Sequence, residues 1–122
     1  MKQTLTKEQS QRLIELGVST EKASSFISND VSYSEVADGK PNYFSPTFTI
    51  GDLLNILPKE ITRNEVVFKI SISGFLQFWN IGYYDDFTKL LLFSANGEEL
   101  IDILLETAIW CIDNGYIKTE KL

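Results

Sequence analysis

The chain has 122 residues, which is the size of one domain with a single modest core. Its aromatic content of 12% argues against disorder, and its net charge of −6, with scattered basic residues, argues against direct binding to nucleic acid. The sequence contains no histidine and one cysteine, which excludes the usual Ser–His and Cys–His catalytic pairs, histidine-based metal sites and an internal disulfide.

The sequence predicts a cytoplasmic protein without membrane contact. Asp102 and Glu106 interrupt the longest apolar stretch, and the first residues lack the apolar core of a signal peptide. A lone cysteine also suits a reducing compartment. The acidic charge suits a basic partner or, more simply, serves solubility.

A helical hairpin is expected over residues 1–27. Its first helix begins at Thr6, which has Gln9 at the spacing of a capping box, and it ends at Gly17. Its second helix is expected over residues 21–27.

Residues 28–47 are rich in Ser, Asn, Asp, Gly and Pro, which predicts a loop-rich edge with one or two short strands near 31–37 and 42–48. Pro41 and Pro46 favour edge positions because proline cannot donate a hydrogen bond to a neighbouring strand. An exposed edge strand here would leave room for self-association by strand addition.

The segment FTIGDLLNILPKEI predicts the start of another helix. Thr49 suits the N-cap and Asp52 the third helical position. Phe48 and Leu53 have the spacing of a hydrophobic staple, and Pro58 ends the helix. Each of these residues has a structural role, so the segment is not interpreted as a catalytic motif.

A sheet is expected next. Apolar and polar residues alternate over 66–73, which predicts a strand. A Ser-Gly pair at 73–74 is expected to turn the chain, so that 75–84 returns as the second strand. Two aspartates at 85–86 mark the next turn, and 89–93 is expected to be the third strand.

A long final helix is predicted from Asn96, its N-cap, to about Asn114, with Gly115 after its end. Cys111 lies on its core face and is expected to be a small buried hydrophobe. The elements together predict an α+β domain, in which a mainly antiparallel sheet of three to five strands packs against the long C-terminal helix, with short N-terminal helices nearby. One domain is expected over residues 1–122.

The apolar arc of this last helix is wider than contact with one sheet requires. Ile103 and Trp110 lie at its border, beside Glu99 and Glu106. We expect the N-terminal helices to cover the two apolar residues; the alternative is that they are exposed for a partner.

No pattern in the sequence indicates catalysis. Glycine-rich phosphate-binding loops and calcium-loop patterns are absent from it. Asp85 and Asp86 are adjacent, as in a solvated turn, and Glu98 and Glu99 suit the first turn of a helix. We therefore expect no enzyme, no cofactor and no metal.

The segment 75–84 is the best candidate for function, because both of its faces carry aromatic residues. The structural interpretation is a central strand covered on both faces, and the functional one is a partly exposed aromatic surface. The candidate partner or ligand surface comprises Trp79, Tyr83, Tyr84, Ile103, Trp110, Glu99 and Glu106.

Three segments carry a resemblance: LIELGVSTEKA, FTIGDLLNILPK and IWCIDNGYI. In order and spacing they resemble a group of small uncharacterised proteins of gut bacteria and their prophages or mobile elements. The resemblance implies a cytoplasmic accessory protein and no catalytic residues.

The function expected from these observations is a non-enzymatic protein-interaction module, such as a phage or mobile-element accessory. A narrower form is an inhibitor or immunity-like protein that masks a basic site on its partner. The alternative is a small-ligand-binding domain that uses the aromatic face of 75–84. Self-association stays open.

Overall fold

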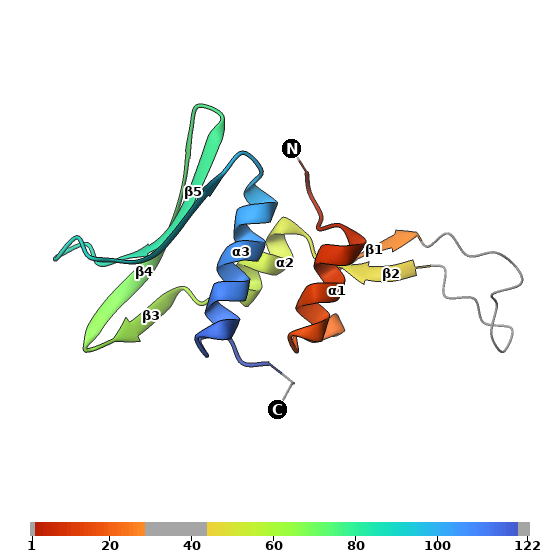
Figure 1. The fold of residues 1–122 in the computed structure, drawn as a ribbon, viewed down its shortest axis with the longest axis horizontal. Coiled ribbons are helices and arrows are strands. Elements are labelled where there is room, and N and C mark those ends of the chain that lie inside the picture. Colours follow the sequence, from red (N-terminus) through yellow and green to blue (C-terminus); the bar gives the residue numbers. More distant parts are fainter. Residues whose placement is uncertain (1, 29–43, 120–122) are drawn as a thin grey trace, which may run out of the picture.

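The computed structural model describes residues 2–28 and 44–119. The expected α+β fold is confirmed: a four-stranded antiparallel sheet packs against the C-terminal helix (Figure 1). The elements, in chain order, are α1 (Lys7–Glu15), a 3₁₀ turn (Thr20–Lys22), β1 (Ser25–Ser28), β2 (Phe44–Thr47), α2 (Ile50–Ile56), β3 (Glu60–Arg63), β4 (Val66–Phe75), β5 (Phe78–Tyr84), β6 (Leu91–Gly97) and α3 (Leu100–Asp113).

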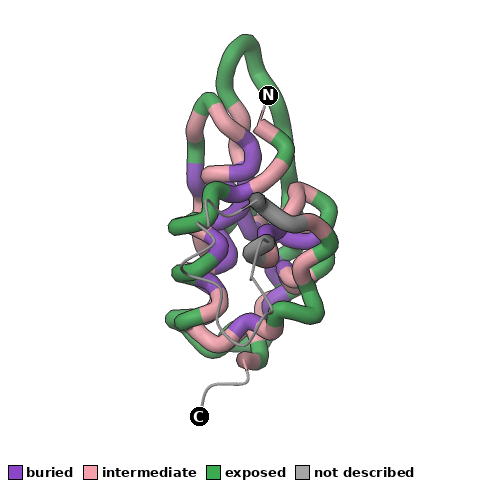
Figure 2. Tube along the Cα trace, turned by 90° about the vertical axis from the view of Figure 1, so that its right-hand side faces the viewer, coloured by how far each residue is buried: buried purple, intermediate pink, exposed green. Residues whose placement is uncertain are grey.

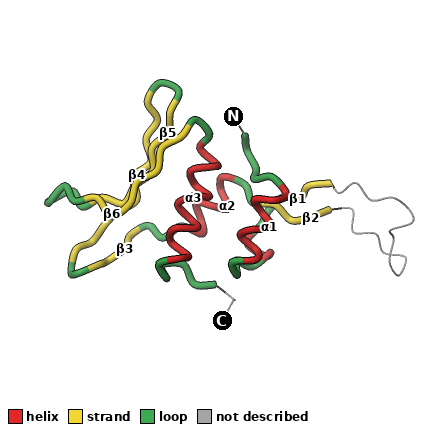
Figure 3. Tube along the Cα trace, viewed as in Figure 1, coloured by secondary structure: helices red, strands yellow, loops and turns green. Residues whose placement is uncertain are grey.

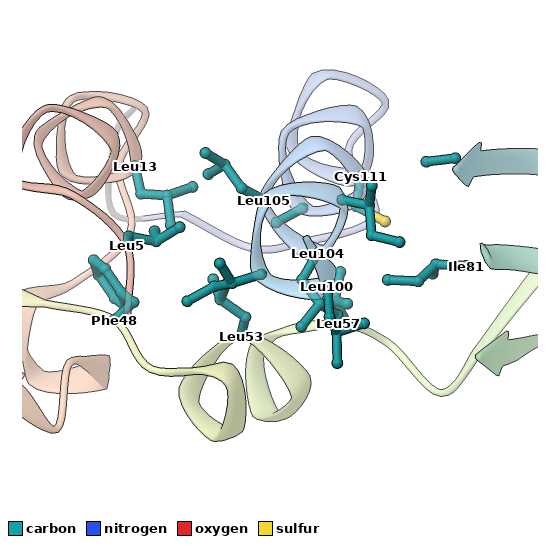
Figure 4. Close-up of a cluster of buried hydrophobic side chains, with 14 of the residues drawn as sticks. Leu5, Leu13, Phe48, Leu53, Leu57, Ile81, Leu100, Leu104, Leu105 and Cys111 are labelled. Atoms are coloured by element: carbon teal, nitrogen blue, oxygen red, sulfur yellow. The ribbon is translucent and has the colours of Figure 1, made fainter. Parts of the chain in front are cut away.

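These elements form three layers. The sheet of β3 to β6 lies on one side, α3 and α2 lie in the middle, and α1 with the β1–β2 pair lies on the other side (Figures 1 and 3). Both sides of α3 therefore contribute to the core. Figure 4 shows Leu105 on the side of α3 that faces Leu13, and Cys111 on the side that faces the sheet.

The first helix begins and ends as predicted. The backbone N–H of Gln9 donates to Thr6 Oγ1 at 3.1 Å, and the N–H of Thr6 donates to Gln9 Oε1 at 2.9 Å, so the capping box is complete. Gly17 adopts a φ of 104°, and the N–H of Val18 returns to the carbonyl of Leu13. This is a Schellman ending, in which glycine accepts the left-handed conformation without strain.

The second helix expected over 21–27 is wrong, and so is the helical hairpin. Residues Thr20–Lys22 form one 3₁₀ turn, and β1 follows it. The cause is tertiary: the Ser24 N–H and hydroxyl both donate to Asp52 Oδ2 at 2.8 Å. This contact holds the chain extended where a helix would continue, and β1 then pairs with β2.

The strand expected near 42–48 is confirmed as β2, whereas the strand expected near 31–37 lies outside the described residues. The helix expected after it is confirmed as α2. Asp52 N–H donates to Thr49 Oγ1 at 3.1 Å, and Thr49 N–H donates to Asp52 Oδ2 at 2.9 Å. Phe48 and Leu53 are fully buried, as a hydrophobic staple requires.

The sheet has the order β3-β4-β5-β6, with every pair antiparallel. The short strand β3 was not predicted. Asn64 and Glu65 join it to β4, both with positive φ, as a tight hairpin turn requires. The pair at 63 and 66 closes that turn, and β3 extends only to Glu60.

The turn predicted at Ser73 and Gly74 is wrong. Strand β4 continues to Phe75, and Leu76 with Gln77 forms the loop to β5. Gly74 serves packing instead, because a Cβ there would lie 3.3 Å from the ring of Trp79, its partner across the strands. A glycine in a strand can mark such a close approach as well as a turn.

The last strand and the start of the last helix also differ from the prediction. The turn at Asp85 and Asp86 is confirmed, but β6 spans Leu91–Gly97 rather than 89–93. Asn96 therefore lies in the strand, where its Oδ1 accepts from Asn80 Nδ2 at 2.6 Å. The N-cap of α3 is Glu99, without a side-chain capping bond, and Gly115 ends the helix as predicted.

Candidate interaction surface

The end of the β4–β5 hairpin projects past the helices (Figure 1), and Figure 2 shows its loop as exposed. Phe75 is 77% exposed, Leu76 is 89% exposed and Phe78 is 53% exposed. We call these three residues the hairpin tip. The segment from Ile70 to Tyr84 contains no Asp, Glu, Lys or Arg, although the chain has a net charge of −6. The tip is therefore an uncharged apolar projection on an acidic protein.

The loop at the tip is built around an unusual residue for a tight turn. Leu76 has a φ of 57°, in the left-handed region that branched apolar side chains rarely adopt. Folding alone would favour Gly or Asn there. Phe75 and Phe78 close the loop as a facing pair, so three large apolar side chains gather at one point.

One edge of the same hairpin lacks a neighbouring strand. Strand β3 pairs with β4 only from Val66 to Lys69. Beyond it, Ser71 to Phe75 has no strand on that side within the described part of the chain. Natural proteins protect such edges with charges, proline or bulges, and this segment has none of the three.

The predicted site residues Trp79 and Tyr83 lie on the face of β5 that meets α3. Tyr83 is fully buried, and its hydroxyl donates to the carbonyl of Pro58 at 2.8 Å. Burial raises the pKa of Tyr83 well above its usual range, and burial also raises the pKa of Cys111 to about 11. Both are structural groups, and Cys111 is buried as predicted. Trp79 is half-buried at the border between core and tip.

The sheet covers Ile103 and Trp110, so the expectation that the N-terminal helices cover them is wrong. Ile103 is 3% exposed and lies against Gly97 of β6, where a Cβ would come within 2.7 Å of it. Trp110 stacks on Phe93 with ring centroids 4.5 Å apart, and Tyr116 lies on it at 5.4 Å. The wide apolar arc of α3 is thus explained by burial on two sides.

The acidic residues of α3 are divided between two environments. Glu99 Oε2 accepts from the backbone N–H of Lys2 at 3.1 Å, whereas Glu106 is exposed. Asp102 receives Lys2 Nζ at 2.8 Å and Gln9 Nε2 at 3.0 Å. Burial alone would raise the pKa of Asp102, but these hydrogen bonds outweigh it and hold the pKa below its ordinary value. This face of α3 is partly occupied by the N-terminal segment.

Tyr84 lies on the outer face of the sheet, in a polar cluster. Its hydroxyl donates to Asn80 Oδ1 at 3.0 Å, and Asn80 Nδ2 donates to Ser94 Oγ at 3.0 Å. The Tyr84 ring covers Gly82, which has no room for a side chain. The cluster therefore fixes Tyr84 against the sheet.

A groove of about 430 Å³ runs beside Tyr84. Lys69, Lys89, Asp85 and Asp86 contribute to its lining, so it carries both signs of charge. The hydrogen bonds from Thr88, above all the one from its hydroxyl, lower the pKa of Asp85, which is a turn-forming group. The aromatic residues that face α3, such as Trp79 and Tyr83, do not line this groove.

The sequence pattern favours the segment 75–84, which contains the hairpin tip, but the candidate surface residues taken from it omit Phe75, Leu76 and Phe78. The feature of the sequence that could have indicated the tip is the uncharged run from Ile70 to Tyr84. The exposure of the tip residues depends on the length of β3 and on which face of the sheet packs against α3. Neither can be predicted from the local sequence pattern.

A comparison of the chain with protein-family models, with curated proteins and with solved structures finds no match. Among the described residues, no helix is both apolar and long enough to cross a membrane. Residues 2–28 and 44–119 also contain no group of three or more His, Cys, Asp or Glu side chains that could hold a metal ion.

Proposed function

We propose that this chain is a non-enzymatic protein-interaction module whose contact surface is the hairpin tip. The observation that carries the proposal is the exposure of Phe75, Leu76 and Phe78 side by side within an uncharged segment. The centres of protein interfaces are depleted in charge and enriched in aromatic anchors. The tip has both properties.

The tip contributes little to the stability of the fold. Side chains at the end of a hairpin that stay in water in the folded chain gain almost no hydrophobic free energy from folding. A gathered patch of them is a typical mark of an interaction site. The left-handed Leu76 adds a second local cost of the kind that is common at functional sites.

A narrower form of the proposal concerns the partner. The charges of the chain lie outside the segment from Ile70 to Tyr84 and are mainly acidic, so they would attract a basic protein while the apolar tip forms the contact. This is the arrangement expected of an inhibitor or immunity-like protein that masks a basic site. The resemblance to small proteins of gut bacteria and their prophages or mobile elements supports a cytoplasmic accessory role of this kind.

The test is site-specific photo-crosslinking in lysate of the cells that encode the protein. A photo-crosslinking amino acid is placed at Gln77 in the hairpin loop, and the matched control carries it at Glu106, which is exposed on α3. We expect a crosslinked protein at Gln77 that is absent at Glu106 and is lost with the Leu76→Ser variant. Equal products at both positions, or none, would overturn the proposal.

A second candidate function is binding of a small polar ligand in the groove beside Tyr84. The groove's paired charges, Lys69 and Lys89 against Asp85 and Asp86, favour a zwitterion such as an amino acid. A thermal-shift screen of amino acids tests it. Stabilisation by one of them that disappears with Lys69→Gln would support this alternative, and no shift with any of them would remove it.

A further inference from the structure

We infer that the free edge of β4, from Ser71 to Phe75, pairs with the same edge of a second copy of this chain. The two copies would form one continuous antiparallel sheet with β4 beside β4. The inference shares the hairpin with the proposed function and rests on that hairpin being an interaction surface. The two proposals involve different groups. Self-pairing uses backbone atoms of the β4 edge, whereas the proposed function uses side chains of the hairpin tip.

The backbone groups of this edge point away from the molecule at alternate residues. Ile70 donates its N–H to the carbonyl of Lys59 at 3.1 Å, on the β3 side of the strand. Because hydrogen-bonding directions alternate along a strand, Ile72 and Gly74 direct their N–H and C=O groups to the same side. Strand β3 does not reach them, so two donors and two acceptors face outward in register.

The free edge is complementary to itself. It is bounded by β3 at one end and by the hairpin loop at the other, so a strand that pairs with it can extend over Ser71 to Phe75 only. A second copy running antiparallel, with Ser73 opposite Ser73, satisfies this limit. In this register Ile72 of each copy lies opposite Gly74 of the other, and all the outward-facing groups are paired.

The side chains of the edge also permit close approach of a second copy. Ser71, Ser73 and Gly74 are small, and the exposed Phe75 of each copy would lie opposite Ser71 of the other. Strand addition of this kind takes its affinity from main-chain hydrogen bonds and its selectivity from alternate side chains.

The charge distribution favours contact between two copies at this edge over contact through the acidic surfaces of the chain. Two copies with a net charge of −6 each repel one another wherever their acidic faces meet. The uncharged run from Ile70 to Tyr84 avoids that repulsion. Self-pairing needs an edge that does not repel itself, and this edge meets the requirement.

The test exploits the two-fold symmetry at Ser73, which is exposed on the outer face. Analytical ultracentrifugation of the purified chain over a range of concentrations should show a monomer–dimer equilibrium. The variants Ser73→Lys and Ser73→Glu should each weaken dimerisation at least about tenfold, because like charges would lie directly opposite one another. An equimolar mixture of the two should restore a dimer containing one of each.

The matched control is Thr62→Lys, an exposed change on β3 of the same sheet, which should dimerise like the native chain. Native chain that stays monomeric at every concentration would overturn the inference. So would single variants that dimerise as tightly as the native chain, or a mixture that fails to pair.

Hydrogen exchange provides a measurement that needs no variant. The amides of Ile72 and Gly74 should exchange several-fold more slowly as the native chain is concentrated, and concentration-independent exchange at both would overturn the inference. The result is separable from the proposed function. A monomeric chain that crosslinks another protein at Gln77 would refute self-pairing alone, and a dimer that captures no other protein would refute the proposed partner alone.

Discussion

The two ends of strand β5 are made of similar residues in opposite environments. Ile81 and Tyr83 are fully buried against α3, whereas Phe78, at the other end of the same strand, is 53% exposed. The buried end is explained by the free energy of folding, because each side chain there leaves water. The exposed end stays largely in water and gains no comparable free energy from folding. The proposed contact of the hairpin tip with another molecule would account for this contrast.

The strongest test of this contrast is truncation at the buried end. Ile81→Ala should lower the free energy of unfolding by about 2–5 kcal/mol, since it removes a fully buried side chain and leaves a cavity between the sheet and α3. Chemical denaturation followed by fluorescence measures the loss. A loss below about 1 kcal/mol would show that the sheet does not pack on α3 as described.

A change at the border between the two ends sharpens the comparison. Trp79 is half-buried, and its ring packs over Gly74. Trp79→Ala should cost about 2–3 kcal/mol, below the roughly 3–5 kcal/mol of a fully buried tryptophan. Denaturation of the variant tests this, and a melt unchanged from the native chain would assign Trp79 to the contact surface instead of the core.

The parts of the fold that could be predicted from sequence are those set by neighbouring residues. The capping box at Thr6, the N-cap at Thr49 and the helix ending at Gly17 follow from spacings of a few positions, and all are confirmed. The errors arise where a distant residue decides. Asp52 keeps the chain at Ser24 extended, which turned the expected second helix into a strand.

The candidate site shows the same limit. Five of the candidates are large aromatic or apolar residues, and their exposure depends on how the layers stack. They are Trp79, Tyr83, Tyr84, Ile103 and Trp110. Tyr83 and Ile103 are buried between the sheet and α3, so neither can contribute to a contact surface. The exposed residues lie at the loop, which the sequence pattern predicts three residues too early.

Asp52 joins α2 to Ser24, the residue that precedes β1. Asp52→Asn should lower the free energy of unfolding by about 1.5–3 kcal/mol at pH 7, because Asp52 accepts hydrogen bonds from Thr49 and Ser24 as a carboxylate. Burial alone would raise the pKa of Asp52, but these bonds outweigh it and lower the pKa.

The sign of the pH dependence follows from that lowered pKa. The stabilisation by Asp52 is fully present above the pKa of an unfolded aspartate, about 3.9, and is lost as the pH falls through the lower folded value. The stability difference between the native chain and Asp52→Asn should therefore shrink in acid. A difference that stays constant from pH 7 to pH 2 would contradict this account of Asp52.

The smallest expected effect on stability is at the hairpin tip, and it decides the comparison between the two ends of β5. Leu76 is 89% exposed in a left-handed conformation, so Leu76→Ser should change the free energy of unfolding by less than about 0.5 kcal/mol. The same variant should lose the crosslinked product at Gln77. A large loss of stability would mean that the tip supports the fold, whereas unchanged stability with unchanged crosslinking would mean that its apolar side chains contact no partner.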